Sequence, residues 1–137
     1  MIECLSHITF IVRDLDRIVT FLTSIFDARE VYSSGDTMFS NAREKFFLAG
    51  DLWIAIMEGD PLPDKTYNHV AFKIREEDFD MYTGRVRSLG VEAQEGRSRV
   101  EGEGRSLYFY DDDNHLFELH TGTLSQRLAR YTNGTQI

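Results

Sequence analysis

The sequence has few of the features that mark disulfide-rich, membrane or nucleic-acid-binding proteins. Its single cysteine, Cys4, excludes an intramolecular disulfide and a cysteine-rich zinc site. No apolar run approaches the length of about 18 residues that a membrane span needs, and the N-terminus lacks a signal-peptide layout, so we expect a cytoplasmic protein. The formal charge of −8 disfavours nucleic acid and anionic membranes as partners, although a small anionic ligand remains compatible with it.

Only two prolines are present, and both fall in the stretch 59–65, which separates two segments with the same predicted order of elements. In the first segment, hydrophobic periodicity predicts a strand, a helix and three further strands, at 5–12, 13–26, 28–34, 44–50 and 51–59. In the second segment the same order is predicted at 67–74, 75–90, 91–94, 105–111 and 115–122, with Gly90 closing the helix. A β-α-β-β-β unit therefore occurs twice.

The duplication predicts an α+β fold in which two βαβββ modules build a shared cleft. We expect one domain over 1–137, with a first module at about 1–60 and a second at about 66–122. A short C-terminal helix is predicted at about 123–131, because Thr123 and Gln126 have the spacing of a capping box. Cys4 lies at the start of the first predicted strand and is interpreted as a small buried residue.

Two of the four histidines occupy matching positions in the two modules. His7 is the third residue of "LSHITFIV" and His69 is the third residue of "YNHVAFKI", and alternation places both on the strand face opposite the helix. Glu118 in "FELHTG" lies on the corresponding face of the last strand, where the first module has Ala55 in "IAIMEG". Two imidazoles and one carboxylate leave coordination positions free, which indicates a catalytic metal site for Mn²⁺, Fe²⁺, Zn²⁺ or a related ion.

Other histidines and acidic residues have simpler interpretations. A single strand histidine is more often packed or exposed than bound to a metal, so the prediction depends on the match between the two modules. His120 shares the face of Glu118 and is interpreted as lying at the rim of the site or behind it, whereas His115 falls in a turn. The acidic run 111–113 lacks the glycine and distal glutamate of an EF-hand loop, so we expect a hairpin turn there.

Arginines gather around the glycine-containing stretch "VEGEG". Arg97, Arg99 and Arg105 flank it, and Arg127 lies on the predicted terminal helix. With the hydroxyl groups of Ser106 and Tyr108 and a divalent cation nearby, these arginines would form a pocket for a phosphate, phosphonate or carboxylate group. The alternative is that the loop arginines are solvated.

Taken in order, "LSHITFIV", "AREKFF", "YNHVAF" and "GEGRSLYFYDDDNHLFELHTGTLSQRL" resemble the FosX type of fosfomycin resistance proteins, in the vicinal oxygen chelate superfamily. The resemblance extends to about Tyr131. It implies a Mn²⁺-dependent hydrolase that opens the fosfomycin epoxide with water, with Glu44 as the base. It also implies a homodimer whose metal sites each take His7 from one subunit and His69 and Glu118 from the other. The implied substrate contacts are Thr9, Trp53, Tyr67, Ser106, Tyr108, Arg127 and Arg99.

Three other activities remain open on this scaffold. Some relatives add glutathione or another thiol to fosfomycin. The glutathione-using branch has a lysine-containing potassium loop, and "GRSRVEGEGRS" lacks that form, which favours water. An extradiol-type dioxygenase would use two histidines and a glutamate with Fe²⁺ and a catechol. A drug-sequestering protein would bind its ligand without metal or turnover, which the complete set of three ligands disfavours.

Overall fold

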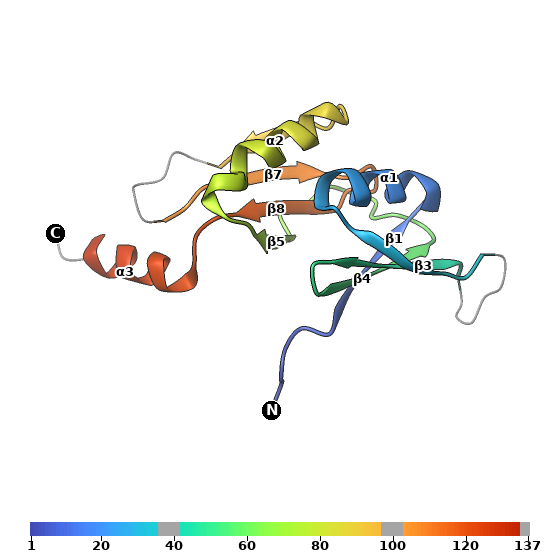
Figure 1. Ribbon diagram of the computed structural model, residues 1–137, viewed down its shortest axis with the longest axis horizontal. Coiled ribbons are helices and arrows are strands. Elements are labelled where there is room, and N and C mark those ends of the chain that lie inside the picture. The colour runs from blue at the N-terminus through green and yellow to red at the C-terminus, as the bar shows by residue number, and fades with distance from the viewer. Residues whose placement is uncertain (36–41, 97–102, 135–137) are drawn as a thin grey trace. The chain divides into compact units, whose positions relative to one another are not determined.

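The computed structural model describes residues 1–35, 42–96 and 103–134, and the chain divides into two compact units (Figure 1). Unit 1 comprises Met1–Lys65 and Asp112–His115, and unit 2 comprises Thr66–Asp111 and Leu116–Ile137. Within the described part of the chain, no helix is both long enough and apolar enough to cross a bilayer.

Unit 1 is a four-stranded sheet covered by one helix. Its elements are β1 (His7–Val12), α1 (Leu15–Phe26), β2 (Arg29–Ser33), β3 (Glu44–Ala49) and β4 (Leu52–Glu58). The strand order is β1-β4-β3-β2, with β1 parallel to β4 and the other pairs antiparallel. The helix begins after Asp14, whose carboxylate accepts hydrogen bonds from the backbone N–H groups of Asp16 and Arg17.

The core of unit 1 lies between α1 and one face of this sheet. The helix buries an apolar stripe made of Leu15, Ile18, Phe21, Leu22, Ile25 and Phe26. The sheet buries the alternate residues of its strands, which are Phe10, Val12, Phe47, Ile54 and Ile56. The residues between them, such as His7 and Thr9, therefore lie on the other face of the sheet, which we call the helix-free face.

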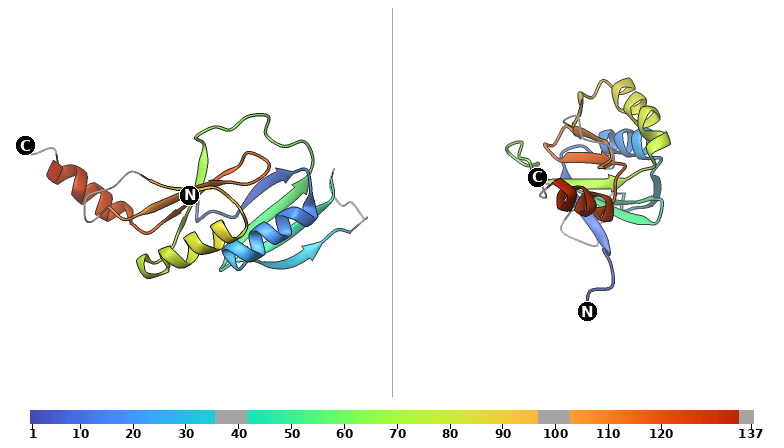
Figure 2. Two further views of the ribbon diagram at one scale, coloured as in Figure 1. Left: turned by 90° about the horizontal axis from the view of Figure 1, so that it is seen from above. Right: turned by 90° about the vertical axis from the view of Figure 1, so that its left-hand side faces the viewer.

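Unit 2 repeats this plan and adds a terminal helix (Figures 1 and 2). Its elements are β5 (His69–Lys73), the 3₁₀ helix η1 (Glu76–Asp78), α2 (Phe79–Ser88), β6 (Ala93–Glu95), β7 (Ser106–Tyr110), β8 (Leu116–His120) and α3 (Leu124–Gly134). The strand order is β5-β8-β7-β6, again with one parallel pair, β5 and β8. The core side of the sheet carries stacked rings of Phe72, Phe117 and Phe109.

The strand registers of the two units match in the parallel pair and in the hairpin that follows it, β1-β4-β3 and β5-β8-β7. In unit 1, Thr9 pairs with Ala55 between the parallel strands, and in unit 2, Ala71 pairs with Glu118. Because His7 and His69 each lie two residues before the paired position on β1 and β5, Ala55 and Glu118 occupy equivalent places. The fold class and the duplicated element order predicted from the sequence are confirmed.

Most differences from the predicted elements lie at their ends. The strands β1 and β5 begin at His7 and His69, two residues later than alternation suggested. Cys4 is exposed because it precedes β1 and so packs against no other strand, and its interpretation as buried is wrong. The capping box at the start of α3 is confirmed: the Thr123 N–H donates to Gln126 Oε1, and the Gln126 N–H donates to Thr123 Oγ1.

Candidate active site

The helix-free face of unit 2 brings several predicted site residues together in three rows. Strand pairing aligns His69 with Leu116 and Tyr110, Ala71 with Glu118 and Tyr108, and Lys73 with His120 and Ser106. Glu118 is therefore the central position, with residues of β5 and β7 on either side of it.

The Glu118 carboxylate is buried and held at both oxygen atoms. Its side chain is 6% exposed, and Oε1 lies 3.0 Å from His69 Nε2. The Ser106 hydroxyl, also buried, donates to Oε2 over 2.6 Å. A carboxylate this far from solvent requires charged or hydrogen-bonding partners on both sides, and these two residues supply them.

The ring of His69 is oriented so that Nε2 faces the carboxylate. Its Nδ1 lies 2.6 Å from the carbonyl oxygen of Tyr67. Since a carbonyl oxygen only accepts, Nδ1 carries the proton, and a proton or a metal cation must separate Nε2 from Glu118 Oε1. Nε2 and Oε1, which lie 3.0 Å apart, would therefore both be available to bind one metal ion.

Two tyrosines lie beside this pair. The Tyr67 hydroxyl donates to the Tyr108 hydroxyl oxygen over 3.2 Å, and the Tyr108 ring packs edge-on against the imidazole of His69. Burial raises the pKa of the Tyr108 phenol, and the hydrogen bond with Tyr67 and the nearby Glu118 carboxylate raise it further. Tyr108 therefore stays neutral at physiological pH and keeps its proton.

In unit 1, the His7 ring also has a polar neighbour at Nδ1, but this neighbour is a hydroxyl group and not a carbonyl oxygen. Its Nδ1 lies 3.0 Å from Ser6 Oγ, which leaves Nε2 for another partner. The ring stacks on Trp53, with centroids 4.2 Å apart, and Thr9 follows it on the same face. Both predicted histidine ligands thus have a hydrogen-bonding neighbour at Nδ1, and in His69 the carbonyl oxygen fixes the proton there, the usual way in which a protein orients a metal-binding imidazole.

Trp53 carries a buried polar atom that lacks a partner. Its ring lies between His7 and the edge of Phe46, and its indole Nε1–H has no acceptor among the described residues. An unpaired buried donor is costly in a folded protein unless a ligand or water completes it. Its position on the helix-free face makes this N–H a candidate donor to a ligand oxygen.

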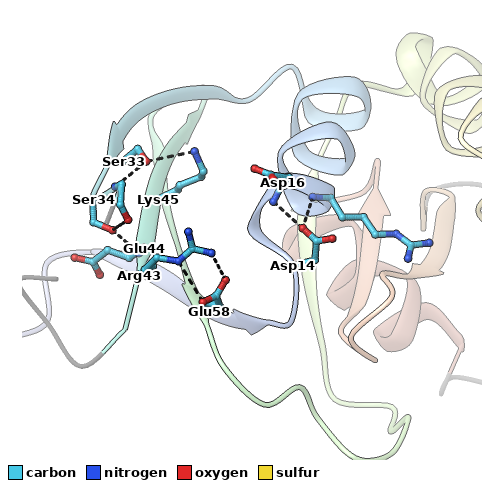
Figure 3. Close-up of polar contacts among 10 residues, drawn as sticks. Asp14, Asp16, Ser33, Ser34, Arg43, Glu44, Lys45 and Glu58 are labelled. Carbon is cyan, nitrogen blue, oxygen red and sulfur yellow. Dashed lines mark hydrogen bonds and ion pairs between the residues drawn. The ribbon is translucent and has the colours of Figure 1, made fainter. Parts of the chain in front are cut away.

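Glu44 begins β3, and the strand register places it on the helix-free face with His7, in one row with Met57 and Ile11. Its backbone is held at both ends by Ser34: the Glu44 N–H donates to Ser34 Oγ, and the Ser34 N–H donates to the Glu44 carbonyl (Figure 3). Its half-buried carboxylate has no hydrogen-bond partner among the described residues, so it can act on a ligand.

The residues next to Glu44 are held by ion pairs that the sequence did not reveal. Arg43 Nε and Nη2 donate to the two carboxylate oxygens of Glu58 (Figure 3). Lys45 Nζ donates to Glu30. The hydrogen bond from Arg43 lowers the pKa of Glu58. Of the consecutive residues Arg43, Glu44 and Lys45, only Glu44 has a charged group with no partner among the residues that the structure describes.

The predicted anion-binding arginines have different outcomes. Arg105 is ion-paired with Glu95 over 2.6 Å and stacks on the Phe79 ring at 3.8 Å, so it faces the core side of the sheet and does not belong to the site. Arg97 and Arg99 lie outside the described residues. Arg127 is half-buried on α3, and no side chain in the described part of the chain pairs with its guanidinium group.

Within the described ranges, no group of three or more His, Cys, Asp or Glu side chains is arranged to hold a metal ion. Unit 2 brings together His69 and Glu118, and unit 1 presents His7 and Glu44. A complete metal site needs a third ligand beside the pair in unit 2.

Comparisons with known proteins give the context of this site. Residues 5–119 match the model of the glyoxalase/bleomycin resistance protein/dioxygenase superfamily. The chain is 62% identical over 136 residues to fosfomycin resistance protein FosX from Mesorhizobium japonicum, covering 99% of this chain and 98% of that protein. It is 35% identical to metallothiol transferase FosB from Staphylococcus saprophyticus, over 96% of this chain and 85% of that protein.

A solved structure of a relative has the same fold. A mutant of FosX from Listeria monocytogenes, complexed with Mn(II) and 1S,2S-dihydroxypropylphosphonic acid, has a TM-score of 0.85 and 60% identity. The match covers 96% of this chain and 99% of that one. The chain therefore belongs to the glyoxalase/bleomycin resistance protein/dioxygenase superfamily and, within it, to the FosX fosfomycin resistance proteins.

Proposed function

We propose that this protein is a Mn²⁺-dependent enzyme that adds water to the epoxide of fosfomycin and so inactivates the antibiotic. The observation that carries the proposal is the pair formed by His69 Nε2 and Glu118 Oε1, which face each other at 3.0 Å. The other ring nitrogen of His69 and the other carboxylate oxygen of Glu118 are already hydrogen-bonded, to the Tyr67 carbonyl and the Ser106 hydroxyl. The dihydroxypropylphosphonic acid bound by the Listeria relative is a vicinal diol, which is the product that water addition would give.

His7, His69 and Glu118 would hold the metal. Two neutral imidazoles and a carboxylate suit Mn²⁺ and leave positions for substrate oxygens. When bound, the ion supplies Lewis acidity toward the oxirane oxygen and orients the phosphonate. We further propose a homodimer in which His7 of one subunit completes the site formed by His69 and Glu118 of the other, as the resemblance to FosX proteins implies.

Glu44 would serve as the base. Its carboxylate takes one proton from water while the water oxygen bonds to the phosphonate-bearing carbon and the bond from that carbon to the oxirane oxygen breaks. The oxirane oxygen then takes a proton from solvent and Glu44 releases its proton to solvent, so that one water has been added and the diol is formed. A half-buried carboxylate without a competing partner can approach the water, because nothing in the described structure holds it elsewhere.

The remaining predicted contacts would bind the anion and shape the pocket. Tyr67 and Tyr108 offer phenolic hydroxyl groups beside His69, and Trp53 offers its unpaired N–H. Thr9 lies on the same face as His7, and Arg99 and Arg127 would add positive charge for the phosphonate. Ser106 differs from these residues, because its hydroxyl group already donates a hydrogen bond to Glu118.

The reaction is tested by incubating metal-free protein with fosfomycin and Mn²⁺, with and without a thiol, and following the products by phosphorus NMR. A diol formed without thiol supports the proposal. A thiol adduct alone would assign the protein to the transferase chemistry of its FosB relatives. No product in either sample, with Mn²⁺ shown to bind, would require a different substrate.

The shared site is tested by mixing subunits. Neither His7→Ala nor Glu118→Ala protein should be active alone. A mixed dimer would contain one site with every ligand intact, so random exchange should restore about a quarter of the parent activity. Absence of any restoration in dimers shown to exchange would contradict the shared site and place all ligands in one chain.

A further inference from the structure

Behind Glu118, three side chains form a continuous hydrogen-bonded chain. Ser106 Oγ lies 2.6 Å from Glu118 Oε2 and 2.8 Å from His120 Nδ1. The direct distance from His120 Nδ1 to Glu118 Oε2 is longer, 3.4 Å, so the hydroxyl is the link between the two. Ser106 is 3% exposed and the His120 side chain is 14% exposed, so the serine link is buried and the histidine reaches solvent only in part.

The direction of each hydrogen bond in this chain follows from the chemistry of its members. As a carboxylate, Glu118 only accepts, so the single hydroxyl proton of Ser106 points to Oε2. The Ser106 oxygen must then accept from His120, which fixes the proton of that imidazole on Nδ1. After these two bonds the Ser106 hydroxyl has no proton left to donate to a phosphonate.

The backbone holds Ser106 and His120 side by side through a close crossing of two glycine-containing segments. The Arg105 N–H donates to Thr121 Oγ1 over 2.8 Å, and the Thr121 N–H donates to the Arg105 carbonyl over 3.0 Å. A Cβ atom on Gly122 would lie 2.8 Å from His120 Nε2 and closer still to a backbone carbonyl of the other segment. The glycine thus leaves the space that the His120 ring occupies.

We propose that Ser106 and His120 are positioning residues that hold Glu118 for the metal, and that Ser106 does not bind the phosphonate. This inference depends on the proposed function in that it takes Glu118 as a metal ligand. With Oε2 fixed by Ser106, the other oxygen, Oε1, is directed toward His69. Without the hydrogen bond from Ser106, the carboxylate could rotate and metal binding would weaken. Residues that hydrogen-bond to a metal ligand typically contribute about 10- to 100-fold to metal affinity.

The test measures Mn²⁺ affinity without substrate, from the electron paramagnetic resonance signal of free Mn²⁺. Ser106→Ala removes the link, and His120→Leu removes the donor behind it. His120→Asn is the matched control, since its amide can place an N–H near the position of Nδ1. We expect the dissociation constant to rise about 10- to 100-fold in the first two variants and to return toward the parent value in the third. The KM for fosfomycin at saturating Mn²⁺ should stay near that of the parent.

The outcomes separate this inference from the proposed function. If Ser106→Ala binds Mn²⁺ like the parent and raises only KM, Ser106 binds substrate and the inference is wrong. If His120→Asn is as weak as His120→Leu, the hydrogen-bond chain is not the cause, and this pair decides the matter even if Ser106→Ala does not fold. If the parent fails to bind Mn²⁺, or Glu118→Gln binds it equally well, the proposed metal site itself is wrong.

Discussion

Replacing Glu44 with glutamine tests the proposed base with little disturbance of the fold. The amide has the size of the carboxylate, and the backbone bonds to Ser34 do not involve the side chain. Since the carboxylate has no hydrogen-bond partner among the described residues, we expect the free energy of unfolding to change by no more than about 0.5 kcal/mol. Metal affinity should also be unchanged, because Glu44 is not one of the proposed ligands.

The expected effect is confined to the chemical step. A positioned general base contributes about 10²- to 10⁴-fold to the rate, which corresponds to roughly 3 to 5.5 kcal/mol of transition-state stabilisation. The loss should appear in kcat, measured as diol formation by phosphorus NMR at saturating Mn²⁺ and fosfomycin. The melting temperature and the Mn²⁺ dissociation constant of the same sample show whether fold and metal site are intact.

Glu30→Gln is the matched control for this experiment. Glu30 belongs to the same sheet, but it pairs with Phe47, whose side chain is buried on the core side, and its carboxylate accepts a hydrogen bond from Lys45. The same charge is therefore removed from the face that does not carry the site. Parent-like turnover in Glu44→Gln, with intact metal binding, would refute the assignment of the base. Equal losses in both variants would point to a general effect of charge.

Three further changes have outcomes set by the structure. Removal of Mn²⁺ with a chelator should lower the melting temperature, and Mn²⁺ at 100 times its dissociation constant should raise the free energy of unfolding by about 2.7 kcal/mol. The melting temperature of Glu118→Gln should be the same with and without the ion. Because Arg43 lowers the pKa of Glu58, their ion pair stabilises the fold above the unfolded carboxyl pKa of about 4.3, and this stabilisation is lost as the pH falls through the lower folded pKa. Arg43→Gln should therefore flatten the acid side of a plot of melting temperature against pH. Identical slopes in parent and variant would contradict this. Gly122→Ala should destabilise by about 1–3 kcal/mol in denaturant unfolding, while Gly84→Ala, whose added Cβ meets nothing within 4 Å, should stabilise its helix; the reverse order would discredit the close crossing.

The sequence predicted the fold because its signals are local. Alternation of polar and apolar residues identified the face of each strand, and the spacing of Thr123 and Gln126 identified the start of α3. The equivalence of His7 with His69, and of Ala55 with Glu118, follows from the same period-two pattern applied to both modules. These residues could therefore be assigned to one kind of face before any strand pairing was known.

The contacts that fix the site could not be predicted in this way. Ser34 and Glu44 are 10 residues apart, and Ser106 and Glu118 are 12 apart, so both contacts depend on the register between strands. His120 was expected at the rim or behind the site, and only the register places it in the row of Ser106. Arg105 was grouped with the other arginines because they are close in sequence. Alternation along the strand places it on the face opposite Ser106, and there it pairs with Glu95.

The matching registers also bear on how such a protein can change. Ser106 and Glu44 occupy equivalent corners of the two sheets, and Glu118 and Ala55 occupy equivalent centres. Unit 2 thus has a carboxylate at the central position, Glu118, and unit 1 has one at the other position, Glu44, so that equivalent positions of the same fold carry different side chains in the two units. Because the hydrophobic core lies on the helix-bearing faces, the chemistry of the helix-free faces can differ between the two units while the apolar pattern that specifies the fold stays the same.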